Sequence, residues 1–294
     1  MTRPNVALLA DRGVVAVTGD DAAKLLQGII TNDMDLLATQ PAIHAALLTP
    51  QGKILFEFIV ARANSGYLVD IARSQTGDFI KRLTLYKLRA KVDIRDASED
   101  YRVIALWGSP AQGHGEMRGS ISFADPRLPA LGVRIVAEAG LADDVMTANG
   151  SDAGIAAYDA HRIAVGIPEL GKDYISGTTF AHEANLDSLK SVSFSKGCFI
   201  GQEVAGRREH RGTARPRTVI VEADGPLAPP SVITAGEAQI GTVGSTAGLR
   251  ALALVRLDRA EEAGQKGQQV TAGGTPLDIH RPGYLKPVTA TATS

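Results

Sequence analysis

The stretch Lys196-Gly197-Cys198-Phe199-Ile200-Gly201-Gln202-Glu203 holds the only cysteine of the chain. A glycine precedes Cys198 directly and another follows three residues later, so the backbone can turn sharply and another molecule can approach. A helix is predicted to begin near Gly201 and to run to about His210. Its unpaired N–H groups and its dipole favour an anion near the cysteine. Lys196 adds a positive charge two residues away, and both effects favour the thiolate. The pattern therefore predicts a functional thiol.

Two other interpretations of Cys198 stay open from the residues alone. Free cysteine is often a small buried apolar residue, and Phe194, Phe199 and Ile200 are neighbours that fit such a role. A cysteine protease would need a histidine and an orienting amide or acid, and the six histidines are scattered along the chain. One cysteine also falls short of the usual four thiolates of a zinc or iron–sulfur site. We therefore predict no permanent metal, and Cys198 as a transient cluster ligand at most.

Basic residues crowd the segment after the cysteine. Glu203 and Arg207 stand four apart in the order that favours an ion pair on a helix. The basic cluster comprises Arg207, Arg208, His210, Arg211, Arg215 and Arg217. A solvated helix C-terminus explains it, because cations are favoured there, and an anion site is the alternative. Direct binding of nucleic acid is disfavoured, since no set of stacking aromatic residues accompanies the arginines.

The regions on either side of this segment predict an α+β protein. From residue 215 to about 286, short β-like runs alternate with Gly and Pro, which is typical of a small β-barrel. Residues 287–294 are predicted to be a disordered tail. Residues 1–214 are predicted to form an α+β body of two interleaved units, the inner one roughly 50–140. Its main signals are a hairpin at Asn64-Ser65-Gly66 and helices over Thr76 to Arg89 and Gly154 to Ala164.

Composition narrows the class of protein. A chain of 294 residues has room for two domains and a small third one. A single cysteine cannot form an internal disulfide, which predicts a reducing compartment. The net charge of −1 gives no general affinity for nucleic acid. No apolar run reaches the roughly 18 residues of a membrane span, and the first residues lack the features of a signal or transit peptide. The expected location is therefore the cytoplasm, as in bacteria.

The octapeptide at 196–203, followed by Arg207, resembles the signature of the YgfZ family. This family belongs to the aminomethyltransferase-like superfamily, which includes the glycine cleavage T-protein. Further blocks resemble the family in the same order along residues 14–212. They comprise residues 19–22, 26–28, 31–33 and 48–53, then Arg162 with 166–168, Gly171 and Asp173, and finally 183–186. The wording near the cysteine is closest to the branch that includes the mitochondrial late-stage iron–sulfur assembly factor.

The resemblance implies a ring of three domains around a hole that accommodates folate. It also implies a role in making or repairing [4Fe–4S] proteins, including radical enzymes that modify tRNA. The expected partners are iron–sulfur assembly proteins and those client enzymes, and the expected cofactor is a weakly bound tetrahydrofolate or folate derivative. By the same resemblance, Cys198 is the functional thiol within a motif that also contains Lys196, Gly197, Gly201, Gln202, Glu203 and Arg207. The folate-type pocket would contain Asn32, Asp33, Arg162, Glu183 and Asn185.

Two departures from the family of transferases weaken an enzymatic interpretation. Where those enzymes carry an acidic pair, this chain has Phe56 and Glu57, and the glutamate that reads the pterin ring falls on Ala164. An unpaired pterin would cost binding free energy, so tight folate binding and glycine cleavage are disfavoured. We therefore expect an accessory factor in preference to a classical enzyme. The alternatives are a tetrahydrofolate-dependent one-carbon transferase or demethylase, and a structural adaptor.

Overall fold

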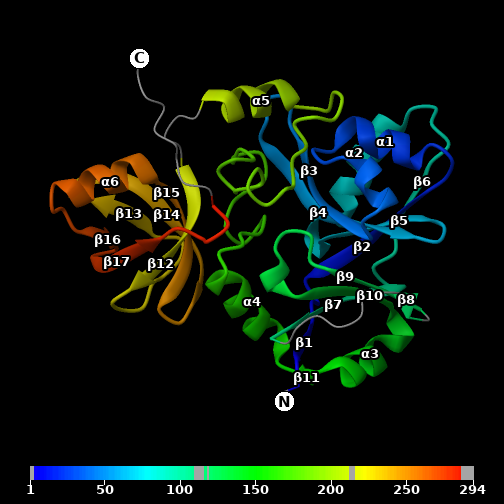
Figure 1. Ribbon diagram of the computed structural model, residues 1–294, viewed down its shortest axis with the longest axis horizontal. Helices are drawn as coiled ribbons and strands as arrows, with labels where there is room; N and C mark the ends of the chain where they lie inside the picture. The colour runs from blue at the N-terminus through cyan, green and yellow to red at the C-terminus, as the bar shows by residue number, and fades with distance from the viewer. Residues whose placement is uncertain (1–2, 109–115, 118, 212–215, 286–294) are drawn as a thin grey trace. The chain divides into compact units, whose positions relative to one another are not determined.

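The computed structural model describes residues 3–108, 116–117, 119–211 and 216–285 (Figure 1). The predicted tail at 287–294 lies outside these residues. The chain divides into two compact units. The first contains Met1–Leu48, Leu55–Tyr158 and Lys190–Ile200, and the second contains Thr49–Ile54, Asp159–Leu189 and Gly201–Ser294.

The first unit is built on two sheets. One has five strands in the order β3-β4-β5-β2-β6, and the other has six in the order β11-β1-β7-β10-β9-β8. The strands of the five-stranded sheet are β2 (Arg12–Thr18), β3 (Ala42–Leu48), β4 (Ile54–Ala63), β5 (Gly66–Ala72) and β6 (Asp93–Asp96). Those of the six-stranded sheet are β1 (Asn5–Leu8), β7 (Tyr101–Trp107), β8 (Glu116–Met117), β9 (Ser120–Ala124), β10 (Val133–Glu138) and β11 (Ser151–Asp152).

The alternation of side chains along β2 creates two cores in this unit. Val15 and Val17 pack with helices α1 (Ala22–Ile29) and α2 (Thr76–Lys87). Val14 and Ala16 point to the opposite face and pack with residues of the six-stranded sheet. That sheet in turn buries its other face against helix α3 (Ala142–Asn149). The layers are thus helix, sheet, sheet and helix (Figure 1).

Most predicted elements of this unit are found, with corrections at their ends. The hairpin is confirmed, since Ala63 pairs with Gly66 across the turn, and α4 (Gly154–Ala164) has the predicted bounds. Helix α2 ends at Lys87, before the predicted Arg89, because Leu88 adopts a φ of 46°. The short 3₁₀ helices are η1 (Met34–Ala38), η2 (Arg73–Gln75), η3 (Pro129–Leu131) and η4 (Ala139–Leu141).

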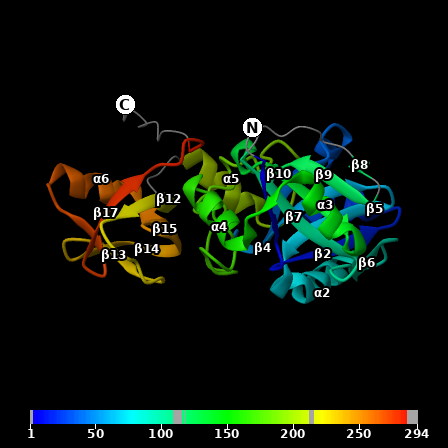
Figure 2. The same ribbon diagram turned by 90° about the horizontal axis from the view of Figure 1, so that it is seen from below.

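The second unit carries the C-terminal barrel. Six strands close in the order β12-β15-β14-β13-β16-β17, which confirms the predicted β-barrel. They are β12 (Pro216–Ala223), β13 (Val232–Ala235), β14 (Ala238–Ala247), β15 (Arg250–Arg256), β16 (Val270–Ala272) and β17 (Thr275–His280). Helix α6 (Leu257–Gln265), which the sequence analysis did not predict, lies against the barrel strands (Figure 2). Its Leu257 and Ala263 belong to the barrel core. Helix α5 (Gln202–Arg211) precedes the barrel in the sequence.

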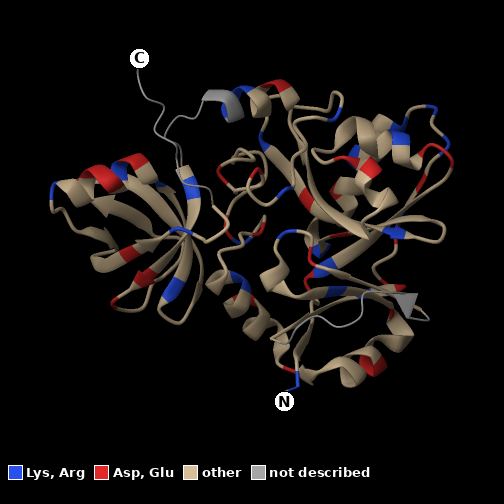
Figure 3. Ribbon diagram, viewed as in Figure 1, with Lys and Arg blue, Asp and Glu red and all other residues tan. Residues whose placement is uncertain are grey.

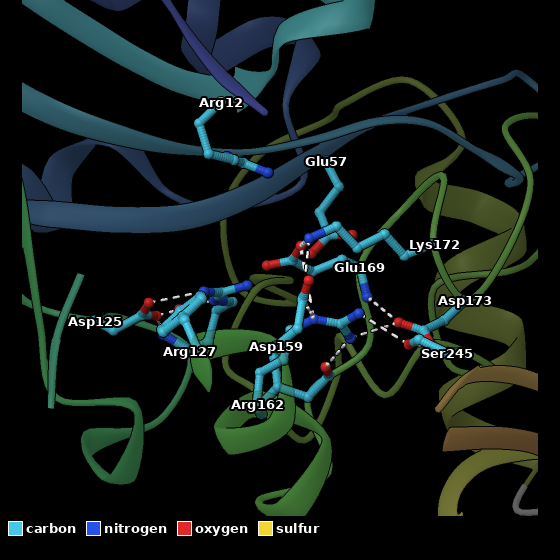
Figure 4. Close-up of polar contacts among 12 residues, drawn as sticks. Arg12, Glu57, Asp125, Arg127, Asp159, Arg162, Glu169, Lys172, Asp173 and Ser245 are labelled. Atoms are coloured by element: carbon cyan, nitrogen blue, oxygen red, sulfur yellow. Dashed lines mark hydrogen bonds and ion pairs between the residues drawn. The ribbon is translucent and has the colours of Figure 1, made fainter. Parts of the chain in front are cut away.

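A buried ion-pair network ties the two sheets of the first unit together. Arg134, which is 1% exposed, lies 3.3 Å from a carboxylate oxygen of Asp70 and 3.1 Å from one of Asp125. Arg127 donates two hydrogen bonds to Asp125, at 2.9 and 2.8 Å (Figure 4). Burial raises the pKa of Asp125, but Arg127 and Arg134 outweigh burial and hold that pKa well below its usual range. The carboxylate therefore stays charged and paired.

We predict that Asp125→Asn destabilises the first unit by about 3 kcal/mol near neutral pH, because it leaves buried arginines without their counter-charge. The pKa of Asp125 is lowered by folding, so its contribution is present above its ordinary value of 3.8 and is lost on acidification below it. Urea denaturation at several pH values measures this. The difference between wild type and variant should narrow as the pH falls, and a constant difference would contradict the ionic role. Asp93→Asn, on the exposed strand β6, is the control.

Candidate functional site

The cysteine segment presents its thiol to solvent between two buried residues. Cys198 and Gly197 are exposed, whereas Lys196 and Phe199 are only 7% and 6% exposed. The interpretation of Cys198 as a small buried apolar residue is therefore wrong. A thiol that is exposed while its neighbours are fixed in the protein is accessible to a reactant or a metal.

Lys196 anchors this segment through its ammonium group. Its Nζ donates hydrogen bonds to the carbonyl oxygens of Gln27 at 2.7 Å, Ile30 at 2.9 Å and Asn32 at 2.7 Å. These carbonyls lie at and just beyond the C-terminus of α1, where the helix dipole favours a cation. An ammonium carries three N–H donors, and all three are used. We expected Lys196 to act on the thiol, and the structure instead gives its hydrogen bonds to the main chain.

Burial perturbs the ionisation of this lysine. Desolvation lowers the pKa of Lys196 to about 8, although Asp33 and Asp35 act in the opposite direction. The ammonium also lies 5.5 Å from the centre of the Phe199 ring, which favours the charged form. Lys196 therefore remains a cation at neutral pH, at a cost in solvation that its carbonyl partners offset.

A second set of hydrogen bonds fixes the start of the cysteine segment to the loop after α1. The Asn32 side chain donates to the carbonyl oxygens of His44 at 2.8 Å and Lys190 at 2.9 Å. The Thr31 hydroxyl donates to the carbonyl oxygen of Ser191 at 2.7 Å and accepts from the amide of Ala46 at 2.8 Å. Because each bond joins residues far apart in the sequence, the cysteine segment has a defined position on strand β3.

The hydrogen bonds of Thr31 and Asn32 to residues 190 and 191 are here called the clamp. His44 connects the clamp to strand β4. Its Nδ1 lies 2.6 Å from the Ser191 hydroxyl and its Nε2 lies 3.0 Å from a carboxylate oxygen of Glu57. An ionised Glu57 accepts from Nε2–H, which leaves Nδ1 to accept from the serine hydroxyl. The order of groups is that of a nucleophile, a base and an orienting acid. Ser191 is 0% exposed, however, so this relay positions the chain and offers no accessible nucleophile.

Strand β4 also determines where Glu57, the remaining acid of the pair found in the transferases, points. Phe56 belongs to the core on the helix side, where its ring meets Phe79 edge-on at 5.3 Å. Glu57 points to the other face, as expected for adjacent strand residues, and is 7% exposed. Its carboxylate is held by His44. The only acid left from the pair is thus engaged in a structural hydrogen bond.

Asn32 and Asp33, predicted for a folate-type pocket, belong to the clamp in the first unit. Both polar atoms of the Asn32 side-chain amide are hydrogen-bonded. Its Nδ2 donates to the carbonyl oxygen of His44, and its Oδ1 accepts from the main-chain amide of Asp33 at 2.9 Å. Asp33 caps η1 and accepts from the Gln27 side chain at 2.8 Å. These two residues therefore organise the main chain near the cysteine segment.

Arg162, also predicted for the folate-type pocket, is the centre of a buried network in the second unit (Figure 4). It is 0% exposed and donates to Asp159 at 2.7 Å and to Asp173 at 2.7 Å. It also bonds Ser245 of β14 at 2.8 Å, which ties the segment after α4 to the barrel. Burial lowers the pKa of Arg162, but the negative charges of Glu169, Asp173 and Asp159 outweigh burial and raise the pKa above its usual value. Its donors are committed to the fold.

Glu183 and Asn185 complete the predicted pocket residues, again in the second unit. Glu183 accepts from the amide of Phe180 at 2.8 Å, and Arg208 lies 3.6 Å from its carboxylate. Asn185 adopts a φ of 60° and donates to the carbonyl of Thr218 at 2.8 Å. Its Oδ1 is buried without a hydrogen-bond partner among the described residues.

These contacts do not fit the folate site as predicted. Arg162, Asn32 and Glu57 each form hydrogen bonds with other groups of the protein itself. Among the predicted pocket residues, Asn185 has a buried side-chain oxygen that lacks a donor in the described part of the chain. One orphan acceptor falls short of the several paired groups that tight recognition of a pterin requires.

The basic cluster after the cysteine is mostly paired. Glu203 and Arg207 form the predicted ion pair on α5, a helix that carries both acidic and basic residues (Figure 3). Arg208 and Lys53 lie over the ring of Phe180, at 3.1 and 3.5 Å from its centre. Arg217 donates to Asp187 at 2.6 Å. The side chains of His210 and Arg211, and all of Arg215, lie outside the described residues. Among the described members, the cluster holds turns and α5 together, and it does not form an open anion site.

Sequence reasoning missed His44 and Ser191 and the role of Glu57 beside them. The three residues are separated by 13 and 134 positions, and no spacing pattern connects them. Only the pairing of β3 with β4, together with the return of the chain at 190–200, brings them together. A lone histidine in an apolar strand was the one available signal.

No group of three or more histidine, cysteine, aspartate or glutamate side chains among the described residues is arranged to hold a metal ion. No helix in the same part of the chain is long and apolar enough to cross a membrane.

We predict that Lys196→Met lowers the free energy of unfolding by about 2–3 kcal/mol, because three main-chain carbonyls lose their donor. Folding lowers the pKa of Lys196 from 10.5 to about 8, so the unfolded chain binds the extra proton between those values. The stability advantage of wild type over the variant should therefore grow as the pH rises from about 8 to 10.5. Denaturant titrations at three pH values measure it. Lys190→Met, at an exposed lysine of the same segment, is the control, and equal losses in both variants would contradict the anchoring role.

Family models match two parts of the chain. Residues 5–114 match the GCVT N-terminal domain and residues 215–287 match the CAF17 C-terminal beta-barrel domain. The crystal structure of glycine cleavage system aminomethyltransferase T from Bartonella henselae has a TM-score of 0.78 at 18% identity, over 97% of this chain and 87% of that one. This likeness confirms the predicted aminomethyltransferase-like fold.

Curated relatives share more of the sequence. The mitochondrial iron–sulfur cluster assembly factor IBA57 homologue of Mycosarcoma maydis is 35% identical, over 73% of this chain and 56% of the relative. The chain thus spans little more than half of that relative's length. These relatives are named as mitochondrial, which contradicts our prediction of a bacterial-type cytoplasmic location. The absence of a recognisable targeting pattern in the first residues was a poor guide, since it says nothing of where the relatives act.

The match to the human relative covers a larger share of both chains. Human mitochondrial iron–sulfur cluster assembly factor IBA57 is 32% identical, over 82% of this chain and 72% of the human protein. With that identity over that share of the human protein, and with the GCVT and CAF17 domain matches in the same order, this chain belongs to the family of the iron–sulfur cluster assembly factor IBA57.

Proposed function

We propose that this protein is an accessory factor in the assembly or repair of [4Fe–4S] proteins and that Cys198 is its working thiol. The observation that carries the proposal is the exposure of the only cysteine between two buried anchors, Lys196 and Phe199. The printed names of the relatives, iron–sulfur cluster assembly factors, support the same role.

The number of cysteines limits what the thiol can do. A cluster bound to protein alone usually takes four thiolates, and this chain has one cysteine. A cluster that meets Cys198 must therefore keep most of its ligands on another protein, so the contact is shared and transient. Such a ligand must be accessible and already in place, because ordering a flexible loop on contact would reduce affinity.

The hydrogen bonds around the segment supply that order. Lys196, two positions before the thiol, is held by its own hydrogen bonds to the main chain. Thr31 and Asn32 hold the main chain at residues 191 and 190. In this proposal Lys196 is a positioning residue, and Cys198 alone contacts the cluster or the reacting sulfur of a partner. The thiol acts either as a cluster ligand or as a nucleophile.

The finer parts of the function follow the resemblance to the YgfZ family. We propose that the partners are iron–sulfur assembly proteins and [4Fe–4S] client enzymes, including radical enzymes that modify tRNA. A one-carbon transferase is less well supported, because Phe56 faces the core and Glu57 is bound to His44. Such chemistry needs an acid poised to exchange a proton with the substrate.

We predict that Cys198→Ala and Cys198→Ser fold like wild type and fail to restore [4Fe–4S] enzyme activity in cells that lack this protein. An exposed side chain contributes little to stability, so the melting temperature should be unchanged. Activities of [4Fe–4S] enzymes in cell extracts measure the outcome. Ser195→Ala, at an exposed position in the same segment, should restore activity fully. Full activity with Cys198→Ala would exclude the thiol and favour the structural adaptor.

We predict that the protein binds tetrahydrofolate only weakly, with a Kd in the micromolar range or above, about −8 kcal/mol at best. The superfamily fold favours some binding, and the commitment of Arg162 and Asn32 to internal bonds limits it. Titration calorimetry under oxygen-free conditions measures the affinity. A nanomolar Kd would show that other residues form the site.

A further inference from the structure

Helix α2 presents two leucines to solvent. Leu85 is 67% exposed and Leu88, directly after the helix, is 87% exposed. The opposite side of the helix buries Thr76, Phe79 and Leu83 in the core. Leu85 lies in the last turn of the helix and Leu88 follows three residues later at its end, so the two exposed leucines lie near each other and form one apolar spot. Single exposed apolar residues are ordinary, and adjacent ones on a rigid helix are informative.

The backbone at Leu88 makes this spot unusual. Its φ is 46° and its ψ is −110°, and the amide of Ala90 donates to the carbonyl of Lys87 at 2.8 Å. This is the geometry of a turn whose first central residue has a positive φ, a position that glycine dominates. A leucine there strains the backbone and also exposes its side chain. Neither the strained backbone nor the exposed side chain of Leu88 shows a benefit for folding in the described part of the chain.

Cations surround the two leucines. Lys81 and Lys91 are 79% and 80% exposed, and they lie 3.1 Å from Asp78 and 3.9 Å from Asp20. Within the described part of the chain, no carboxylate lies in ion-pair range of the three other basic residues near the helix end. Those three are Arg82, Lys87 and Arg89. Lys81 and Lys91 are thus each near one acid, whereas Arg82, Lys87 and Arg89 add positive charge near the apolar spot that no described carboxylate balances.

The chemistry of this surface selects its occupant. Nucleic acid would use the cations and leave the leucines without apolar partners. A lipid surface would need a larger apolar face than two leucines provide. A second copy of the chain in a symmetric dimer would bring like charges together, which costs free energy. A protein with an apolar pocket bordered by carboxylates satisfies both features at once.

We propose that Lys81, Leu85, Leu88, Arg89 and Lys91, here called the α2 surface, dock a partner protein through such an acidic-rimmed apolar pocket. Leu88 enters the pocket, and its strained turn holds the side chain outward before contact. Preorganisation of this kind reduces the entropy lost on binding. The cations steer the partner and fix its orientation.

Photo-crosslinking in cells tests the proposal with a defined probe. Leu88→benzoylphenylalanine should crosslink to a protein, and the crosslinked peptide should be apolar and flanked by Asp or Glu. Val232→benzoylphenylalanine, at a 48% exposed position of the barrel, is the matched control. Crosslinks to lipid, to nucleic acid or to a second copy would overturn the proposal, as would a yield at position 88 no higher than at 232.

The purified crosslinked protein then serves as the binding partner. Leu85→Ser and Leu88→Ser should each raise the Kd about tenfold or more, because truncation of a buried interface leucine removes an anchor. Arg89→Glu should raise it as well, and higher salt should weaken wild-type binding. An unchanged Kd in all three variants would overturn the proposal.

Leu88→Gly separates docking from folding. Glycine accepts the positive φ, so this variant should unfold at a higher temperature than wild type while binding the partner at least about tenfold more weakly. Wild-type binding by Leu88→Gly would overturn the role of the side chain. Crosslinking at position 88 should persist in Cys198→Ala, so failure of the docking surface and failure of the thiol are distinguishable.

Discussion

The buried ammonium of Lys196 is the interaction on which the geometry of the cysteine segment depends. It donates to the carbonyls of Gln27 and Ile30, which are otherwise unpaired acceptors of the C-terminus of α1, and to the carbonyl of Asn32 in the loop that follows. One side chain thus satisfies the end of one element and fixes the position of a segment more than 160 residues later in the sequence. Removing it would expose both the helix end and the thiol loop to rearrangement.

The hydrogen bonds around Lys196 share its character, because they are buried and join distant parts of the chain. Thr31, Asn32 and His44 bind residues 190 and 191, and Glu57 orients His44 from the neighbouring strand. In a medium of low dielectric constant, such bonds are strong when complete and costly when broken. These bonds therefore reinforce one another in holding the cysteine segment in place. Residues 197 and 198 are exposed between the buried Lys196 and Phe199.

Local traces in the sequence allowed most secondary-structure elements and an accessible turn at Cys198 to be predicted, and the resemblance to a known family supplied the overall fold. Glycines flank Cys198, apolar alternation marks the strands, and the helices at Thr76 and Gly154 show the expected period. The role of Arg162 was not predictable from such traces. A fully buried arginine depends on nearby carboxylates, which here come from Asp159 on α4 and from Glu169 and Asp173 after it. The early end of α2 was missed for a related reason. Leucine at residue 88 favours continuation of the helix, and only tertiary structure reveals that it holds a glycine-like conformation.

Two features of the first unit cost the isolated chain free energy or chemical safety. A free exposed thiol is open to oxidation, and a leucine with a positive φ is strained and hydrated. Natural proteins keep such features where a partner makes use of them. In the proposed function, a chain with one cysteine cannot enclose a cluster, so the remaining ligands would arrive on another protein, and that protein would have to be held while the thiol reacts. An exposed thiol with no docking surface would meet its cluster only by chance collision. The anchored cysteine and a charged apolar surface on the same unit therefore make sense together, as the reactive and the holding parts of one transient complex.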